Sequence, residues 1–122
     1  MGKKQVMEIN SEARFIINSL NLKPHPEGGY FRCTHESEQV VWIPSYEGPR
    51  RTATTIYYML VGNQFSTFHR IKSDEIWHFY LGSPLTLHTI SQNGQVDKIT
   101  LGTDIRSGHL PQTVAKANCW LA

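Results

Sequence analysis

Six short segments of strand-like composition follow one another through most of this chain, and turn-forming residues separate them. The segments are rich in β-branched and aromatic residues, which favour an extended backbone. They are QVVWI (39–43), TATTIYYMLV (52–61), QFSTFHRI (64–71), EIWHFYL (75–81), PLTLHTI (84–90) and QVDKITL (95–101). Many short strands with regular turns predict an all-β sandwich or barrel.

A single helical pattern precedes these segments. Its apolar residues recur at the i, i+3, i+4, i+7 spacing of one helix face, and they are Ala13, Ile16, Ile17 and Leu20. With Asn10 or Ser11 as the N-cap, the pattern predicts one short helix over residues 9–21. The prolines and glycines of KPHPEGGYFRC (23–33) then forbid regular helix and lead into the barrel, which is expected over 28–122.

The turn between the last two segments has the clearest sequence signature. It reads SQNG (91–94), and an Asn-Gly pair accepts the left-handed backbone conformations of a tight hairpin turn. We therefore predict a hairpin in which both Asn93 and Gly94 are left-handed.

Length and composition restrict the class of protein. A chain of 122 residues is expected to form one domain, 1–122. The net charge is +2 and the basic residues are scattered, which argues against a nucleic-acid partner. No apolar run approaches the roughly 20 residues of a membrane span, and the first residues lack a signal peptide, so we expect a cytoplasmic protein without a membrane partner. Cys33 and Cys119 form no CxxC pair and are expected to be inert.

The stretch FHRIKSDEIWHFYLG (68–82) places ionisable side chains among apolar ones. Alternation along an extended chain puts His69 on the same face as Ile71. In the following run, one face carries an acid and two large aromatic residues, Glu75, Trp77 and Phe79. If the two strands are antiparallel neighbours, His69 and Glu75 face one apolar cavity. Burying a carboxylate costs several kcal/mol unless it is paired or its pKa is raised, so these two are the candidate catalytic residues.

Other residues are candidates for binding a ligand, and they are Glu27, Tyr30, Arg32, Trp77, Phe79, His88 and Gln112. Glu27 lies just before a strand, where loops over a barrel mouth commonly hold binding residues. Arg32 shares a face with Tyr30, and its planar guanidinium suits an anion. The tryptophan and phenylalanine would form an aromatic wall, with plain core packing as the alternative. Whether His88 and Gln112 face the inside of the barrel depends on a strand register that the sequence leaves open.

Four stretches carry a resemblance to a known family. Together, PHPEGGYFR, FHRIKSDEIWHFYLGSPLTLH, LGTD and PQTV resemble the DUF985 family of small jelly-roll proteins, also called cupin_5, from about Leu22 to Trp120. The resemblance implies a double-stranded β-helix with a ligand cavity inside the barrel and a tendency to dimerise. At the level of the superfamily, the chain is similar to sugar-nucleotide 3,5-epimerases, which are cupins that move protons without a metal.

The departures from this resemblance concern metal ligands. A metal-binding cupin has a second histidine in its first motif and another in its second motif, and those positions hold Ile71 and Leu121. One imidazole and one carboxylate do not make a tight transition-metal site. We therefore expect no metal and no other cofactor.

Two functions from different classes remain open. In the first, the cavity only binds a small sugar-like or planar metabolite. In the second, the protein is an isomerase or epimerase in which His69 removes a proton next to a carbonyl and Arg32 or Tyr30 stabilises the enolate. The lack of a second clear acid-base residue favours binding. A metal-dependent cupin enzyme is a further alternative, weakened by the missing ligands.

The end of the chain suggests an assembly. Members of this family generally continue past the tryptophan matched by Trp120, so the C-terminal strands of the barrel are expected to be missing. An open strand edge recruits another strand. We therefore expect a homodimer with strand pairing or exchange, to which the N-terminal segment and the apolar segment 39–43 are suited.

Overall fold

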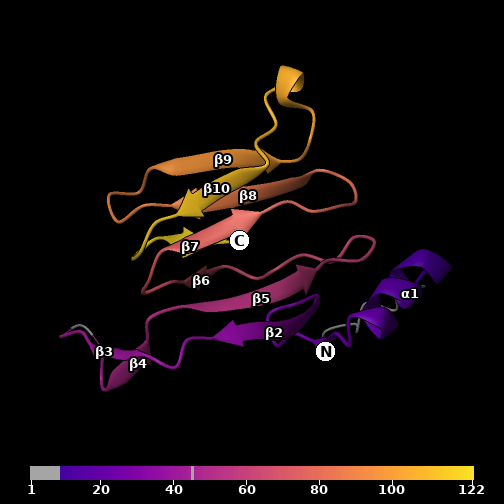
Figure 1. Ribbon diagram of the computed structural model, residues 1–122. Helices are drawn as coiled ribbons and strands as arrows, with labels where there is room; N and C mark the ends of the chain where they lie inside the picture. Colours follow the sequence, from indigo (N-terminus) through magenta and orange to yellow (C-terminus); the bar gives the residue numbers. More distant parts are fainter. Residues whose placement is uncertain (1–8, 45) are drawn as a thin grey trace, which may run out of the picture. The chain divides into compact units, whose positions relative to one another are not determined.

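The computed structural model describes residues 9–44 and 46–122, and these form two compact units that meet in the chain between Ser66 and Thr67. One short helix is followed by strands throughout, which confirms the predicted all-β class (Figure 1).

The first unit begins with the predicted helix, α1 (Ser11–Ser19). The side chain of Asn10 caps it by accepting a hydrogen bond from the backbone N–H of Ala13 at 2.8 Å. This cap satisfies the free backbone N–H of Ala13 in the first turn, so the helix begins at Ser11, directly after the cap residue. The predicted helix is confirmed, although it is shorter at both ends than residues 9–21.

Two small antiparallel sheets complete the first unit. In the three-stranded sheet, β2 (Tyr30–Glu36) lies between β1 (Lys23–Pro24) and β5 (Thr54–Met59). The other sheet is a ribbon of β3 (Val40–Trp42) and β4 (Pro49–Arg51), in which every residue is exposed. Neither β1 nor β4 was predicted, since both are short and contain proline.

The second unit consists of two sheets and a single 3₁₀ turn, η1 (Ile105–Ser107). Its strands are β6 (His69–Arg70), β7 (Glu75–His78), β8 (Leu85–Ile90), β9 (Val96–Leu101), β10 (Gln112–Ala115) and β11 (Trp120–Leu121). One sheet has the order β6-β11-β8-β9, and the other pairs β7 with β10. Of the predicted segment QFSTFHRI, only two residues are strand.

The apolar core of the second unit lies between its two sheets. The core cluster comprises Ile71, Leu87, Ala115 and Leu121, with Trp77 packed against it. Since its members come from both sheets, each sheet has an inner face that carries the cluster and an outer face that does not.

The hairpin between β8 and β9 only partly follows the prediction. Ser91 and Gln95 are joined by a backbone hydrogen bond of 2.9 Å, which closes the turn. Gly94 is left-handed, with φ of 85°, whereas Asn93 does not have a positive φ. The prediction for Asn93 is wrong because one left-handed residue after an ordinary turn already reverses the chain.

No helix in the described part of the chain combines the length and the apolar character that a membrane crossing requires.

Candidate functional site

The inner faces of the second unit carry the two candidate catalytic residues. In β6, His69 shares its face with the buried Ile71 and pairs with the buried Leu121 of β11. In β7, Glu75 pairs with the buried Ala115 of β10. Opposed residues of antiparallel strands point to the same side of a sheet. Both ionisable side chains therefore lie on the faces that carry the core cluster.

Burial along the central stretch follows the predicted alternation. Glu75, Trp77 and Phe79 are half-buried, and the residues between them are exposed. The indole Nε1 of Trp77 donates a hydrogen bond to Oε2 of Glu75 at 3.3 Å, which ties the carboxylate to a ring that packs against the core cluster. Phe79 lies just beyond β7 and continues its line, since its N–H donates to the carbonyl of Pro111 at 2.8 Å.

The described hydrogen bond of His69 fixes its tautomer. Nδ1 lies 3.0 Å from the carbonyl oxygen of Thr67. A carbonyl oxygen only accepts hydrogen bonds, so this bond requires the imidazole proton to be on Nδ1. In the neutral ring, Nε2 is then the basic nitrogen.

The premise that the strands of His69 and Glu75 are neighbours is wrong. The strand β6 pairs with β11, while β7 pairs with β10 in the other sheet. The segment that connects β6 to β7 is hydrogen-bonded to a residue near the end of the chain. The carboxylate of Asp74 in this segment accepts a hydrogen bond from the backbone N–H of Ala117 at 2.8 Å. His69 and Glu75 therefore belong to two different sheets with a shared core, and a cavity that both of them face stays a prediction.

The register places two other candidates on outer faces. His88 follows the buried Leu87 in β8, so its side chain lies on the opposite face, across from Lys98 of β9. Gln112 pairs with His78, and its Nε2 lies 3.2 Å from Nδ1 of that residue, both being exposed. Neither residue shares a face with His69 or Glu75, and contact with a ligand stays a prediction for both.

A second group of polar and aromatic side chains lies in the first unit, around the turn in the motif HPEGG. Nδ1 of His25 accepts a hydrogen bond from the N–H of Glu27 at 3.0 Å, and the hydroxyl of Tyr58 donates to the carbonyl of Gly28 at 2.6 Å. The His25 ring lies edge-on to Phe31 at 4.8 Å and to Tyr58 at 5.4 Å between centroids. The turn thus holds an imidazole, a carboxylate and a phenol together.

Tyr58 was not among the residues predicted from the sequence to belong to a site. Burial raises its pKa above the ordinary value of 10.0, the hydrogen bond with Ser66 opposes this, and the charge of Glu27 raises the pKa further. Glu27, a predicted ligand-binding residue, is half-buried, and its Oε2 is fully buried. The feature that distinguishes Tyr58 from other tyrosines is the pairing of β5 with β2, which places Tyr58 opposite Phe31 and cannot be read from the sequence.

We expect Tyr58 to ionise at a higher pH than an ordinary tyrosine. Its raised pKa means that the neutral phenol is favoured by folding, so its contribution to stability is present below the ordinary pKa and is lost as the pH rises through the raised value. The absorbance of phenolate, titrated in the wild type and in Tyr58→Phe, measures this, because the difference between the curves belongs to Tyr58. A difference curve centred at or below the ordinary pKa would contradict the prediction.

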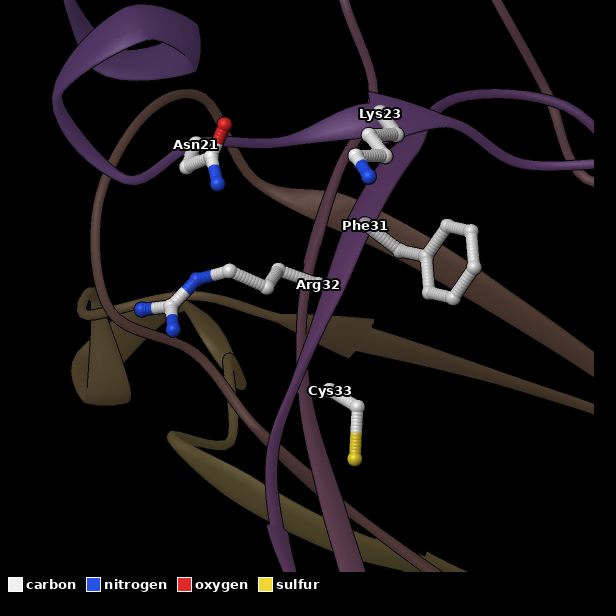
Figure 2. Close-up of a pocket in the computed structure, with 5 residues that line it drawn as sticks. All are labelled: Asn21, Lys23, Phe31, Arg32 and Cys33. Atoms are coloured by element: carbon white, nitrogen blue, oxygen red, sulfur yellow. The ribbon is translucent and has the colours of Figure 1, made fainter.

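The remaining candidates, Tyr30 and Arg32, lie two residues apart in β2. The Nε of Arg32 donates to the carbonyl of Leu20, which follows α1, at 2.6 Å, and its guanidinium lies 5.4 Å from the ring centroid of Tyr57. Figure 2 shows Arg32 and Phe31 pointing to opposite sides of the strand. An open hollow of about 250 Å³ beside them is lined by Asn21, Lys23, Phe31, Arg32 and Cys33. Two cations at this hollow are compatible with an anionic ligand, which stays a prediction for Arg32.

The residues of the second unit do not fit a transition-metal site. The two positions at which a metal-binding cupin has further histidines hold Ile71 and Leu121, whose side chains belong to the buried core cluster. Across residues 9–44 and 46–122, no three His, Cys, Asp or Glu side chains are grouped so that they could hold a metal ion. A tight site takes three or four such ligands.

Comparisons with known proteins agree with this architecture. A family model described as "Cupin superfamily (DUF985)", Cupin_5, matches residues 14–122. A solved structure of a hypothetical protein from Leishmania major is 30% identical with a TM-score of 0.84, and the match covers 89% of this chain and 67% of that one. A protein from Shewanella oneidensis is 34% identical with a TM-score of 0.79, over 94% of this chain and 68% of that one. No curated protein matches significantly.

Proposed function

Since the chain belongs to the DUF985 family of the cupin superfamily and has its jelly-roll fold, we propose that it binds a small molecule at the inner faces of the second unit. His69 and Glu75 are the residues proposed to contact the ligand. Because no curated protein matches this chain significantly, the proposal takes no activity from a relative and rests on the chemistry of the chain's own side chains.

One observation carries the proposal. His69 and Glu75 are half-buried on faces that otherwise hold the apolar core cluster. Placing ionisable groups there costs free energy, because polar groups lose hydration on burial. Sites for small molecules have this composition, mostly apolar with a few polar groups that fix orientation.

The proposed ligand is a sugar-like or planar metabolite. Trp77 and Phe79 continue the face of Glu75, and the indole is held in place by its hydrogen bond to the carboxylate. Aromatic rings stack on flat ligands and on the apolar faces of sugars. Together with one imidazole and one carboxylate, they offer both apolar contact and hydrogen bonds.

The second candidate is a metal-independent isomerase or epimerase. The bond from Nδ1 of His69 to the carbonyl of Thr67 favours it, because this bond orients the imidazole, as a general base requires. Such an enzyme removes a proton from carbon next to a carbonyl, and it also needs an acid on the opposite face of the substrate. No described contact identifies that acid, which makes binding the preferred proposal.

We expect His69→Ala and Glu75→Gln each to weaken binding by about tenfold or more, since each removes or weakens a hydrogen bond proposed to hold the ligand. The measurement is a thermal-shift screen of sugar phosphates, sugar nucleotides and purines, followed by titration calorimetry of each hit. Glu75→Gln keeps an oxygen that accepts from Trp77, so it is expected to fold.

His35→Ala and Glu38→Gln are matched controls, because both residues are exposed in the first unit. They should leave the binding of every hit unchanged. Hits that bind the His69 and Glu75 variants as tightly as the wild type would place the ligand elsewhere. Incubation of each hit in heavy water then separates the candidates: deuterium incorporation that disappears in His69→Ala identifies an enzyme, whereas its absence identifies a binding protein.

Two further expectations remain proposals. A homodimer is supported by β3, in which every residue is exposed and Trp42 is the largest side chain. The cytoplasmic location rests on the sequence alone.

A further inference from the structure

A second hollow lies on the outer face of the β6-β11-β8-β9 sheet. It has a volume of about 300 Å³ and is lined by Arg70, Ser91, Gln92, Asn118 and Trp120. Trp120 of β11 pairs with Arg70 on one side and with Ile90 of β8 on the other, so its indole stands in the middle of this face. All of these residues belong to the second unit.

The indole of Trp120 is exposed, whereas the side chain of the next residue, Leu121, is buried. Trp120 keeps 47% of its surface accessible, whereas Leu121 keeps 1% and belongs to the core cluster. The strand therefore turns its leucine inward and its tryptophan outward. Exposing a large aromatic ring gains nothing for folding, since its burial is what stabilises a protein. On this face the ring is a flat apolar platform beside a polar rim.

The rim offers both donors and acceptors of hydrogen bonds. Gln92 and Asn118 each supply a side-chain amide that donates and accepts, and the hydroxyl of Ser91, whose proton is donated to Asn93, supplies an acceptor. Sugar hydroxyls also donate and accept, so this combination suits them better than it suits a purely acidic or basic ligand. The apolar C–H face of a pyranose ring stacks on an indole at the same time.

The backbone of this rim is held in place by the fold. Asn118 has a left-handed backbone, with φ of 69°, and its N–H donates to the carbonyl of Ile71 at 2.7 Å. The hydroxyl of Ser91 bonds to the side chain of Asn93 and accepts from the N–H of Gln95 at 3.0 Å. A rim that is ordered before the ligand arrives loses less entropy on binding.

The charge of the lining selects among sugars. Arg70 is the single charged residue of the five, and it is exposed on the same side of the sheet as Trp120. Its planar guanidinium matches a carboxylate with two parallel hydrogen bonds. A hollow of this volume lies at the small end of the range for ligand sites. A single ring with a single carboxylate fits these limits.

We propose that this outer hollow binds a carboxylated pyranose, a uronic acid, with its ring on Trp120 and its carboxylate on Arg70. The site is separate from the proposed inner-face site, because Trp120 and Leu121 point to opposite sides of β11. Its test is therefore independent of whether His69 binds anything.

The test is a titration of the full chain with D-glucuronate, followed through the indole N–H signals in NMR spectra. We expect one indole signal to shift and saturate, with a Kd of about 1–10 mM. Trp120→Ala should remove that signal and the saturable binding. Neutral D-glucose should bind at least about tenfold more weakly, and Arg70→Gln should abolish this preference, because the charge-assisted pair is lost.

Two variants serve as matched controls. Tyr80→Ala removes another exposed aromatic ring from the same unit, and Lys98→Gln removes another exposed cation from the same sheet. Both should bind glucuronate as the wild type does. If Trp120→Ala does not fold, the proposal is tested with Gln92→Ala and Arg70→Gln in its place, and both variants are expected to weaken the binding of glucuronate. An absence of saturable binding, equal binding of glucose and glucuronate, or binding of adenosine monophosphate without glucuronate would each overturn the proposal.

Discussion

Gly29→Ala is expected to lower the free energy of unfolding by about 3–5 kcal/mol, because it adds a clash to an unfavourable backbone conformation. Gly29 is buried, with φ of +81°. A Cβ at this position would lie 2.6 Å from the carbonyl oxygen of Met59 and 2.9 Å from Cδ2 of Leu60. The carbonyl belongs to β5, so the added methyl would push the HPEGG turn away from the sheet. Urea unfolding followed by circular dichroism measures the loss.

Gly94→Ala separates the clash from the backbone strain. Gly94 has φ of +85°, and a Cβ there would have no atom within 4 Å. This variant should cost only about 1–2 kcal/mol, the strain of a left-handed alanine. Equal losses in the two variants would mean that the turn can move to accommodate a methyl group. The close approach of Gly29 to β5 would then contribute little.

Leu87→Ala is expected to lower the free energy of unfolding by about 3–4 kcal/mol. Leu87 is 2% exposed and belongs to the core cluster between the two sheets of the second unit. Its removal leaves a cavity bordered by side chains from both sheets, which cannot easily close together. Thermal and urea unfolding of the variant both report the change.

Leu81→Ala is the matched control, because Leu81 lies in the same unit and is 65% exposed. Its substitution should change stability by no more than about 0.5 kcal/mol. If the two leucine variants were equally stable, the cluster between the sheets would not be the core of this unit.

Local features of the fold could be predicted from the sequence because local physics decides them. The helical spacing and the capping side chain of Asn10 led to α1, and alternation gave the faces of β7. Asn93 was predicted to be left-handed because asparagine is common in left-handed turns, yet of the two turn residues only Gly94 adopts that conformation. Propensity favours a conformation at such positions, and the closing hydrogen bonds select the one that forms.

The hairpin of β8 and β9 could be predicted from its turn, but pairing between strands far apart in the chain could not, because it depends on contacts between distant residues. The segments 64–71 and 75–81 were considered as possible antiparallel neighbours, yet β7 takes β10 as its partner and β6 takes β11. Both partners are short, and the sequence analysis had not recognised either as a strand.

The candidate site follows the same division. Alternation was enough to place His69 and Glu75 on half-buried faces. The faces of His88 and Gln112 needed the register, which puts both on outer surfaces. Tyr58 and Trp120 were missed because only their partners across the sheet distinguish them from ordinary aromatic residues.

Three strand pairs of the second unit, β8 with β9, β7 with β10 and β6 with β11, are nested along the chain, and β11 also pairs with β8. The hairpin of β8 and β9 closes across a turn of a few residues, while Gln112 meets its partner 34 residues away and β11 joins β6 from still further along the chain. Loop-closure entropy makes the hairpin the inexpensive contact to form first. Once it exists, the outer strands are joined by a much shorter effective loop, so each pairing lowers the entropic barrier to the next. The folding rate of this unit is therefore limited by its outermost pairings, as in other topologies dominated by non-local contacts.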